Sequence, residues 1–189
     1  MSRPATAKIA RHKSLKEMID ENLFMTDEEL AEYFSVSVPT IRLDRSDLDI
    51  PELRKRVKDV AQDNVKKVRS LIAVDLPGEL LEIDLNKSGA LALETNQRMT
   101  FTHSDVVRGQ YVYSMAEALA IAVIDSEVAL VGVANIKYKH PIHSGEILLA
   151  KAEVKRIKGN NYIVWVKVFS KKIEVFKGKF ILVSIESKV

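Results

Sequence analysis

Apolar residues in the first fifty positions recur at the spacing of α-helices. Five of them can close a small core between two short helices: Leu30, Phe34, Val36, Ile41 and Leu48. Ala31 stands where those helices must approach closely, because a larger side chain would push them apart. The pattern predicts a small helical module over residues 1–50.

Helix-capping residues indicate where the two short helices begin. Thr26 can accept a hydrogen bond from the amide of Glu29 while the Glu29 side chain reaches back, which is the capping-box arrangement. Ser37 can cap the second helix, and Pro39 suits its first turn. Only a tight turn fits between the helices, so residues 26–48 are predicted to form a helix-turn-helix, of plain or winged type.

The second of these helices carries polar and basic residues near its start. Ser37, Thr40, Arg42 and Arg45 are predicted to lie where a helix in the major groove contacts base edges and phosphates, with the last three facing outward. The module is therefore expected to bind double-stranded DNA. A small helical dimerisation bundle is the alternative, and two arginines beside a helix start argue against it.

Residues 51–69 contain no glycine and are rich in charge. Their apolar residues fall close to one helical stripe: Leu53, Val57, Val60 and Val68. Pro51 suits a first helical turn. The segment is predicted to be an amphipathic linker helix, whose stripe docks on a partner chain or on the following domain.

The pattern changes beyond the linker. Two strands are predicted around a turn at residues 86–89, followed by one long buried helix over residues 105–125. Three or four strands come next, and along residues 146–156 apolar positions alternate with charged ones. The order predicts an α+β domain over residues 70–189, in which an antiparallel sheet wraps one helix.

The amino-acid composition excludes several classes of function. The 189 residues include no cysteine, which excludes disulfides, thiolate metal sites and cysteine nucleophiles. No apolar stretch approaches the roughly 20 residues that span a bilayer. The basic start lacks the apolar core of a secretory signal. A cytoplasmic protein without membrane contact is expected.

The net charge of +3 is too small to diagnose a nucleic-acid-binding protein, but two tracts are strongly basic. Residues 1–16 carry five Lys or Arg and no acid, and residues 151–179 carry nine against two Glu. Either tract could meet phosphates or form a solvated face. Residues 1–16 are expected to be an arm that touches DNA phosphates or is disordered. His140 and His143 lack a third ligand, so no metal is expected.

Three stretches closely resemble the FapR family of bacterial repressors of fatty acid and phospholipid synthesis. They are FMTDEELAEYFSVSVPTIRLDRSDLDIPELRKRVKDVA, FTHSDVVRGQYVYSMAEALAIAVID and HSGEILLAKAEV, and TIRLDR followed by IPELR is specific to the family. The resemblance covers nearly the whole chain. It implies a hot-dog fold for residues 70–189, a homodimer, an inverted-repeat operator, and release from DNA by malonyl-CoA or malonyl-acyl carrier protein. It implies no cofactor.

Three residues match family positions at the malonyl end of the effector pocket: Phe101, Arg108 and Gly109. An arginine can bind the malonyl carboxylate through two parallel hydrogen bonds, and an acetyl group would leave it unpaired. Gly109 lets backbone approach the thioester. The alternative for Arg108 is a capping or bridging role within the dimer. The basic strands could steer the nucleotide phosphates.

Glu117 departs from the family pattern, which has Asn at this position. A second carboxylate near a malonyl carboxylate is unfavourable unless Arg108 or a proton compensates. Related thioesterases of the phenylacetate type place a catalytic Asp or Glu here, so Glu117 could also attack or activate water against an acyl-CoA. Two hypotheses follow: a substitution that tunes structure or ligand, or thioester hydrolysis.

The organisation expected from all this has three parts. Residues 1–50 bind DNA, residues 51–69 form the linker helix, and residues 70–189 bind effector and dimerise. Malonyl-thioester binding is expected to order the loops around Phe101 and Arg108 and to dock the linker helix on the effector domain. The main hypothesis is a regulator and not an enzyme. An acyl-CoA thioesterase with Glu117 as its catalytic carboxylate, or a regulator that answers a different acyl-CoA, are the alternatives.

Overall fold

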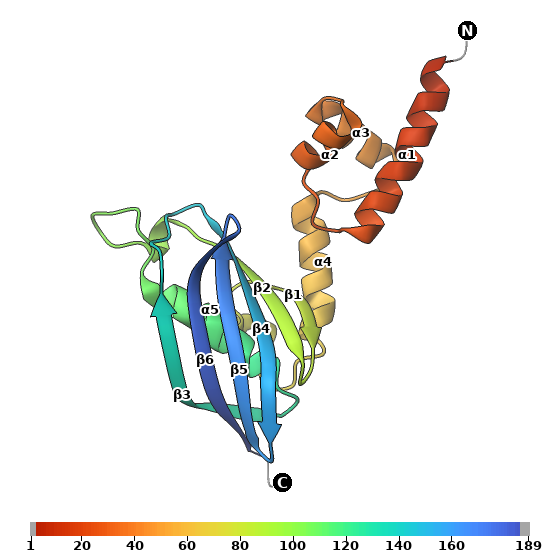
Figure 1. Ribbon diagram of the computed structural model, residues 1–189. Coiled ribbons are helices and arrows are strands. Elements are labelled where there is room, and N and C mark those ends of the chain that lie inside the picture. The colour runs from red at the N-terminus through yellow and green to blue at the C-terminus, as the bar shows by residue number, and fades with distance from the viewer. Residues whose placement is uncertain (1–2, 186–189) are drawn as a thin grey trace. The chain divides into compact units, whose positions relative to one another are not determined.

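The computed structural model describes the backbone of residues 3–185, and the side chains from residue 8 onward except that of residue 73. The chain divides into two compact units, Met1–Asp59 and Val60–Val189. The boundary falls inside the segment that the sequence predicts as the linker helix. Each unit is described by itself below, with the elements labelled in Figure 1.

The first unit is built around a core shared by three helices: α1 (Arg3–Glu21), α2 (Asp27–Phe34) and α3 (Val38–Asp47). The predicted core residues Leu30, Ala31 and Ile41 are buried, and Leu15 and Ile19 of α1 join them. Residues 3–59 contain no strand, so within the described part the helix-turn-helix has no β wing.

The expectation for residues 1–16 is wrong over the part that the structure describes. Residues 3–16 are neither an arm nor disordered, because they form most of α1. Leu15 is fully buried and Ile19, in the next turn, is nearly so. Burying these two side chains holds the helix against α2 and α3, since each contributes roughly 2 kcal/mol of apolar transfer. Residues 1–2 lie outside the described residues.

The predicted helix caps are confirmed. The Thr26 hydroxyl accepts from the Glu29 amide at 3.1 Å, and the Glu29 carboxylate accepts from the Thr26 amide at 2.9 Å. Ser37 caps α3 by accepting from the Thr40 amide at 3.3 Å, with Pro39 in the first turn. Ser35 ends α2 in the left-handed conformation, with φ of 52°, and this makes the turn tight.

Helix α4 (Leu53–Val65) is shorter at both ends than the predicted helix over 51–69. Pro51 precedes the helix instead of entering its first turn. Arg56 is the deepest residue of its first half, and its guanidinium donates to the carbonyls of Leu23, Met25 and Pro51 at 2.6–3.1 Å. These three carbonyls replace the water that a buried guanidinium loses, which explains why a charged residue stands among the apolar ones.

The second unit contains one six-stranded antiparallel sheet in the order β1-β2-β4-β5-β6-β3. The strands are β1 (Glu79–Asp84), β2 (Ser88–Glu94), β3 (Val128–Tyr138), β4 (Ile147–Lys158), β5 (Asn161–Ser170) and β6 (Ile173–Ile185). Two short 3-10 helices, Ala73–Asp75 and Gln97–Met99, lie in the connections. The predicted hairpin is confirmed, with Asn86 in the left-handed conformation at its turn.

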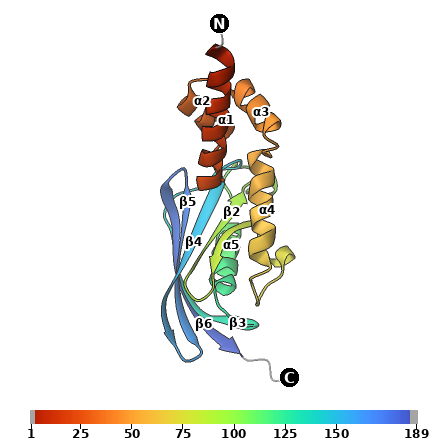
Figure 2. The same cartoon turned by 90° about the vertical axis from the view of Figure 1, so that its right-hand side faces the viewer.

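Helix α5 (Gly109–Ala122) lies against one face of this sheet, which curves around it (Figures 1 and 2). The alternation in β4 buries Leu148, Ala150 and Ala152 under the helix, as predicted. The helix starts four residues later than the predicted position 105, because Arg108 has extended backbone and serves as the N-cap. The sheet wrapped around one helix is the hot-dog arrangement that the sequence resemblance implies.

Two further features of the fold bear on function. Strand β3 is the last of the sheet, so within the described residues one of its edges has no neighbouring strand. Leu130 and Val133 on it are each 53% exposed. No helix among the described residues has the length and apolar content needed to cross a membrane.

Candidate functional site

Helix α3 presents an exposed face beside the tight turn of the helix-turn-helix. Ser37 is exposed and Thr40 half-buried, and their hydroxyl oxygens lie 2.9 Å apart. Arg42 is 63% exposed, and Leu43, which follows it, is 66% exposed. An exposed leucine in the middle of this helix is a feature that the sequence analysis missed. Its signal was present, because Leu43 falls outside the stripe that forms the core.

Arg45 does not belong to this exposed face, and the prediction that it faces outward is wrong. Its side chain is 9% exposed and donates to both carboxylate oxygens of Asp27, at 2.7 and 3.0 Å, and to the Ile50 carbonyl at 3.1 Å. Arg45 lies one turn beyond Ile41, on the buried side of α3. It therefore fastens α3 to the start of α2, and its donors are directed into the protein.

Asp27 is the shared partner of two arginines with different surroundings. Burial raises the pKa of Asp27, but the hydrogen bonds and charges of Arg45 and Arg42 together lower it below the ordinary value. The bond to Arg42 is the longer one, at 3.2 Å from Nε, and this arginine is mostly in solvent. Arg42 can exchange that exposed contact for a phosphate or a base edge at small cost.

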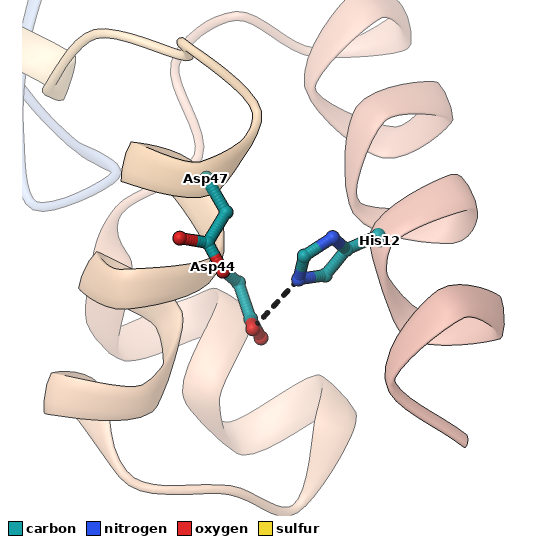
Figure 3. A group of neighbouring side chains, drawn as sticks. All are labelled: His12, Asp44 and Asp47. Atoms are coloured by element: carbon teal, nitrogen blue, oxygen red, sulfur yellow. Dashed lines mark hydrogen bonds and ion pairs between the residues drawn. The ribbon is translucent and has the colours of Figure 1, made fainter. Parts of the chain in front are cut away.

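A second carboxylate cluster ties α1 to α3 (Figure 3). His12 Nε2 lies 2.9 Å from Asp44, and the ligand atoms of His12, Asp44 and Asp47 fall within 4.8 Å of one another. Arg11 Nε also contacts Asp44 at 2.6 Å, and Lys8 contacts Asp47 at 2.7 Å. Since these cations supply the positive charge that a metal ion would bring, the cluster is an ion-pair network. Lys8 and Arg11 are thereby engaged with α3.

The candidate effector site begins at Arg108, directly before α5. Its Nη2 donates to the Arg98 carbonyl at 3.1 Å and to the Tyr111 hydroxyl at 2.8 Å, and its Nε lies 3.4 Å from the Met99 carbonyl. The guanidinium carbon lies 5.1 Å from the centre of the Tyr111 ring. Within residues 3–185 no partner contacts Nη1. Nη1 is thus available to a carboxylate, whereas both hydrogens of Nη2 are donated within the chain, so the two parallel bonds expected from the sequence would require Nη2 to give up one of these partners.

Gly109 follows Arg108 and has a different neighbour from the one expected. A Cβ at this position would lie 3.0 Å from two ring carbons of Tyr138, whose hydroxyl donates to the Gly109 carbonyl at 3.1 Å. The space is taken by an aromatic ring of β3, which no local pattern in the sequence indicates. An open hollow of about 430 Å³ adjoins Gly109 and Tyr138, between the start of α5 and residues 139–142.

Phe101 and Glu117 occupy separate places. Phe101 is 55% exposed on the loop before α5, and that loop closes through a bridge between Thr100 and Val107. Glu117 lies half-buried on α5, about 12 Å beyond Gly109 by the rise of the helix. Its Oε1 accepts from the Tyr113 hydroxyl at 3.2 Å. Phe101 and Arg108 thus lie on the loop before α5 and Gly109 begins the helix, whereas Glu117 lies about two turns further along it.

Comparisons with known proteins agree with the division of the chain into a helix-turn-helix unit and a hot-dog unit. A family model described as a DeoR-like helix-turn-helix domain matches residues 11–62, and a thioesterase superfamily model matches residues 99–177. The protein named Transcription factor FapR in Caldanaerobacter subterraneus subsp. tengcongensis is 52% identical over 95% of this chain and 90% of its own length. Its namesake in Thermoanaerobacter pseudethanolicus is 53% identical over the same shares. The chain belongs to the FapR family.

The FapR relatives are named transcription factors, so the prediction of a regulator and not an enzyme is confirmed, although the second unit shares its fold with thioesterases. A solved structure of a sigma28-regulated virulence protein from Campylobacter jejuni has a TM-score of 0.64 at 19% identity, covering 69% of this chain and 94% of that protein. That likeness concerns the fold alone. The predicted α+β fold with an N-terminal helix-turn-helix is also confirmed.

Proposed function

We propose that this member of the FapR family is a cytoplasmic repressor of fatty acid and phospholipid synthesis genes. It binds an inverted-repeat operator as a homodimer and leaves it when malonyl-CoA or malonyl-acyl carrier protein binds. The observation that carries the proposal is the exposed face of a capped α3, in a chain 52% identical to a named transcription factor over almost its full length. Residues 1–50, 51–69 and 70–189 are its DNA-binding, linker and effector parts.

The DNA contacts are assigned to the exposed start of α3. Ser37 and Thr40 suit phosphate or base hydrogen bonds, and Arg42 suits a guanine edge or a phosphate. Leu43 is added to the set, because an exposed leucine on a helix in the major groove can contact a thymine methyl group. Arg45 is removed from the set, since its donors are directed at Asp27 and Ile50.

The effector contacts are assigned to the loop before α5. The Nη1 side of Arg108 pairs with the malonyl carboxylate, while Tyr111 and two backbone carbonyls hold the other side in place. Phe101 covers the ligand from the exposed loop, and Gly109 borders the hollow of about 430 Å³. Glu117, bonded to Tyr113, is assigned a structural or ligand-tuning role. No bound cofactor is needed for this function.

The homodimer is supported by the open edge of β3. Its eleven residues offer a row of backbone donors and acceptors on that edge, flanked by exposed Leu130 and Val133. Long exposed edge strands pair readily with a second strand. A two-fold dimer formed there provides the symmetry that an inverted repeat requires.

Helix α4 is proposed as the element that couples the parts. Arg56 ties its first half to the carbonyls of Leu23, Met25 and Pro51. The buried Asn64 ties its second half to β1 by donating to the Leu81 carbonyl at 2.8 Å. Effector binding shifts the balance between a DNA-bound state and a state in which the linker docks on the effector domain, and this requires different effector affinities in the two states.

The test measures DNA binding and thiol release in the same samples. A labelled duplex, selected from a random library by the protein itself, is titrated in the presence of malonyl-CoA, acetyl-CoA or free CoA. Malonyl-CoA alone is expected to release the duplex, with no free thiol. Arg42→Ala should weaken duplex binding about tenfold, whereas Arg54→Ala, another exposed arginine, should not. Arg108→Ala should bind the duplex and ignore malonyl-CoA, with Arg98→Ala as its neighbouring control.

Other outcomes would overturn specific parts of the proposal. Equal release by malonyl-CoA and acetyl-CoA would mean that the effector is a different acyl-CoA. Thiol release that Glu117→Gln abolishes would show a thioesterase. If the selected duplexes contain no inverted repeat, the proposal that a dimer binds a two-fold operator is contradicted. If Arg42→Ala binds the duplex as tightly as the unaltered chain, α3 does not make the proposed DNA contact.

A further inference from the structure

The face of the sheet opposite α5 carries four lysines in one cross-strand row. The register places Lys151 of β4 opposite Lys167 of β5, Lys167 opposite Lys177 of β6, and Lys177 opposite Lys137 of β3. We call these four residues the lysine row. All four are exposed. Like charges directly opposite each other destabilise a sheet, so the row is costly for the fold alone and indicates a ligand of opposite charge.

Acidic side chains compensate this charge only in part. Glu174 contacts Lys139 and lies 3.7 Å from Lys167, and Glu153 lies 2.5 Å from Lys155. Within residues 3–185 the other three lysines of the row form no ion pair with an acid. An open hollow of about 480 Å³ lies over the middle of the row, and Lys137, Lys167, Lys177 and Trp165 are among its lining residues. Three of the four lysines therefore border one depression, and Lys151 borders a neighbouring one together with Lys167.

Apolar residues lie beside the row on the same face. In the next row along the strands Trp165 lies opposite Lys179, and in the row after it Ile163 lies opposite Ile181. Trp165 is 47% exposed, with Lys155 Nζ 5.5 Å from the centre of its ring. Successive rows are about 6.7 Å apart along a strand. The lysines and the two isoleucines thus stand about 13 Å apart with the tryptophan between them, close to the 10–12 Å diameter of a helix.

The spacing within the row matches the turn of an α-helix. Neighbouring strands lie about 4.8 Å apart, so the four lysines follow each other at about that interval. Acidic residues three or four positions apart on one helix face follow each other at about 5.4 Å. The mismatch accumulates to about 2 Å over three steps, which flexible lysine side chains can absorb. The apolar residues beside the row favour a helix with an apolar stripe over a DNA duplex, which would present phosphates to both the lysines and the tryptophan.

We propose that this face docks an acidic amphipathic helix of a partner protein. The helix lies across the strands, with its carboxylates on Lys137, Lys151, Lys167 and Lys177 and its apolar stripe on Trp165. Trp165 would become buried under the helix, and an aromatic residue buried on binding beside several charge pairs is the usual composition of an energetically dominant contact. The proposal concerns the second unit alone and does not depend on the operator or on malonyl-CoA.

The test uses the full chain and synthetic peptides. One peptide of about 15 residues has glutamates along one helix face and leucines along the next, and a second has the same composition with both residue types spread around the helix. Trp165 is the only tryptophan of the chain, so its fluorescence reports contact at this face. The first peptide should bind, shift the Trp165 emission to shorter wavelength and weaken with salt. The second should bind about tenfold less tightly.

Variants separate this face from charge in general. Lys167→Glu with Lys177→Glu should weaken binding of the first peptide about tenfold or more. Lys66→Glu with Lys87→Glu, which changes the net charge equally at exposed positions outside the row, should leave binding unchanged. Circular dichroism and thermal unfolding check that both variants keep the fold.

Three outcomes would overturn the proposal. Equal binding of the two peptides would show that charge alone attracts them and that the face has no site specific for an amphipathic helix. Absence of peptide binding in low salt would show that this face is not a docking site for an acidic helix. Tighter binding of an unrelated DNA duplex, or of vesicles containing phosphatidylglycerol, that is lost with Lys167→Glu and Lys177→Glu but not with the control pair, would identify a different occupant.

Discussion

Single carboxylates organise the DNA-binding unit. Asp27 at the start of α2 and Asp44 in the middle of α3 each hold an arginine from another helix. Burial raises the pKa of Asp44, but the hydrogen bonds from Arg11 and His12 and their charges together bring it below the ordinary value. Asp27 behaves in the same way with Arg45 and Arg42. These two residues join three helices whose apolar core is small.

Acid should therefore loosen this unit. Because both folded pKa values lie below the ordinary value of 3.8, the stabilisation from Asp27 and Asp44 is complete above that pH and is lost as the pH falls through the lowered values. Hydrogen–deuterium exchange of α2 and α3, corrected for its intrinsic pH dependence, should show falling protection below about pH 4. Asp44→Asn should lower protection at neutral pH and flatten the acid response.

The matched control is Glu28→Gln, which removes an exposed acid from the same unit. It should change neither the protection at neutral pH nor the acid response. The double variant Asp27→Asn with Asp44→Asn should lose protection less steeply in acid than the unaltered chain does. An equally steep loss would contradict the assignment of the stabilisation to these two carboxylates.

At the scale of elements, the start of α5 is set by a contact between distant segments. Tyr138 of β3 lies against the backbone of Gly109, and its hydroxyl donates to the Gly109 carbonyl. Burial raises the pKa of this hydroxyl, so it stays a protonated donor at neutral pH. The contact fixes the loop that carries Arg108 relative to the sheet, and so it links the candidate effector residues to the strand proposed as the dimer edge.

Gly109→Ala should destabilise the second unit. The added Cβ would lie 3.0 Å from the Tyr138 ring, so the ring or the helix must shift, at a cost of about 1–3 kcal/mol. Urea unfolding followed by Trp165 fluorescence measures the loss. The double variant Gly109→Ala with Tyr138→Val should lose less free energy of unfolding than the sum of the two single variants, because the clash with the Tyr138 ring is then absent.

Gly132→Ala is the control for this prediction. A Cβ there meets only the Ile181 carbonyl, at 3.7 Å, which is an ordinary contact. A loss for Gly132→Ala as large as that for Gly109→Ala would mean that glycine flexibility, and not the Tyr138 contact, sets the effect.

For the whole molecule, the open edge of β3 is the surface at which we propose that two copies pair. Its partner on one side is β6, with pairs running from Val128 and Ile185 to Tyr138 and Phe176. The other side has no strand among the described residues, and the exposed side chains of Leu130 and Val133 on β3 are costly in water. Pairing with a second copy would extend the sheet and bring side chains of that copy beside them.

Val133→Lys should convert the proposed dimer to monomers, because a lysine at an edge opposes strand pairing. Sedimentation velocity measures the change in mass, and duplex titration should show a parallel loss of affinity, since a monomer contacts one half-site. Ile173→Lys changes another exposed apolar residue of the same sheet and should leave the dimer intact. A chain that sediments as a monomer before any substitution would refute the dimer.

The features that the sequence determined by itself are those set by neighbours within about one helical turn or one strand repeat. The capping box at Thr26 and Glu29, the cap at Ser37 and the alternation in β4 need only short-range geometry. The exposure of Arg42 also follows, because it falls outside the apolar stripe. The resemblance to FapR added the hot-dog fold, which the order of helix and strands alone leaves as a sheet around a helix.

Tertiary structure alone decided the features that depend on contacts between distant residues. Arg45 turns inward because Asp27, eighteen positions earlier, neutralises it. Residues 3–16 belong to a helix held in the core and not to an arm, because Leu15 packs with residues of α2 and α3. The lysine row exists because strand register aligns residues far apart along the chain, and shifting one strand by a single residue would turn its lysine to the other face. No local pattern encodes that register. The number of lysines can therefore be counted from the sequence, but their alignment on one face of the sheet cannot be predicted from it.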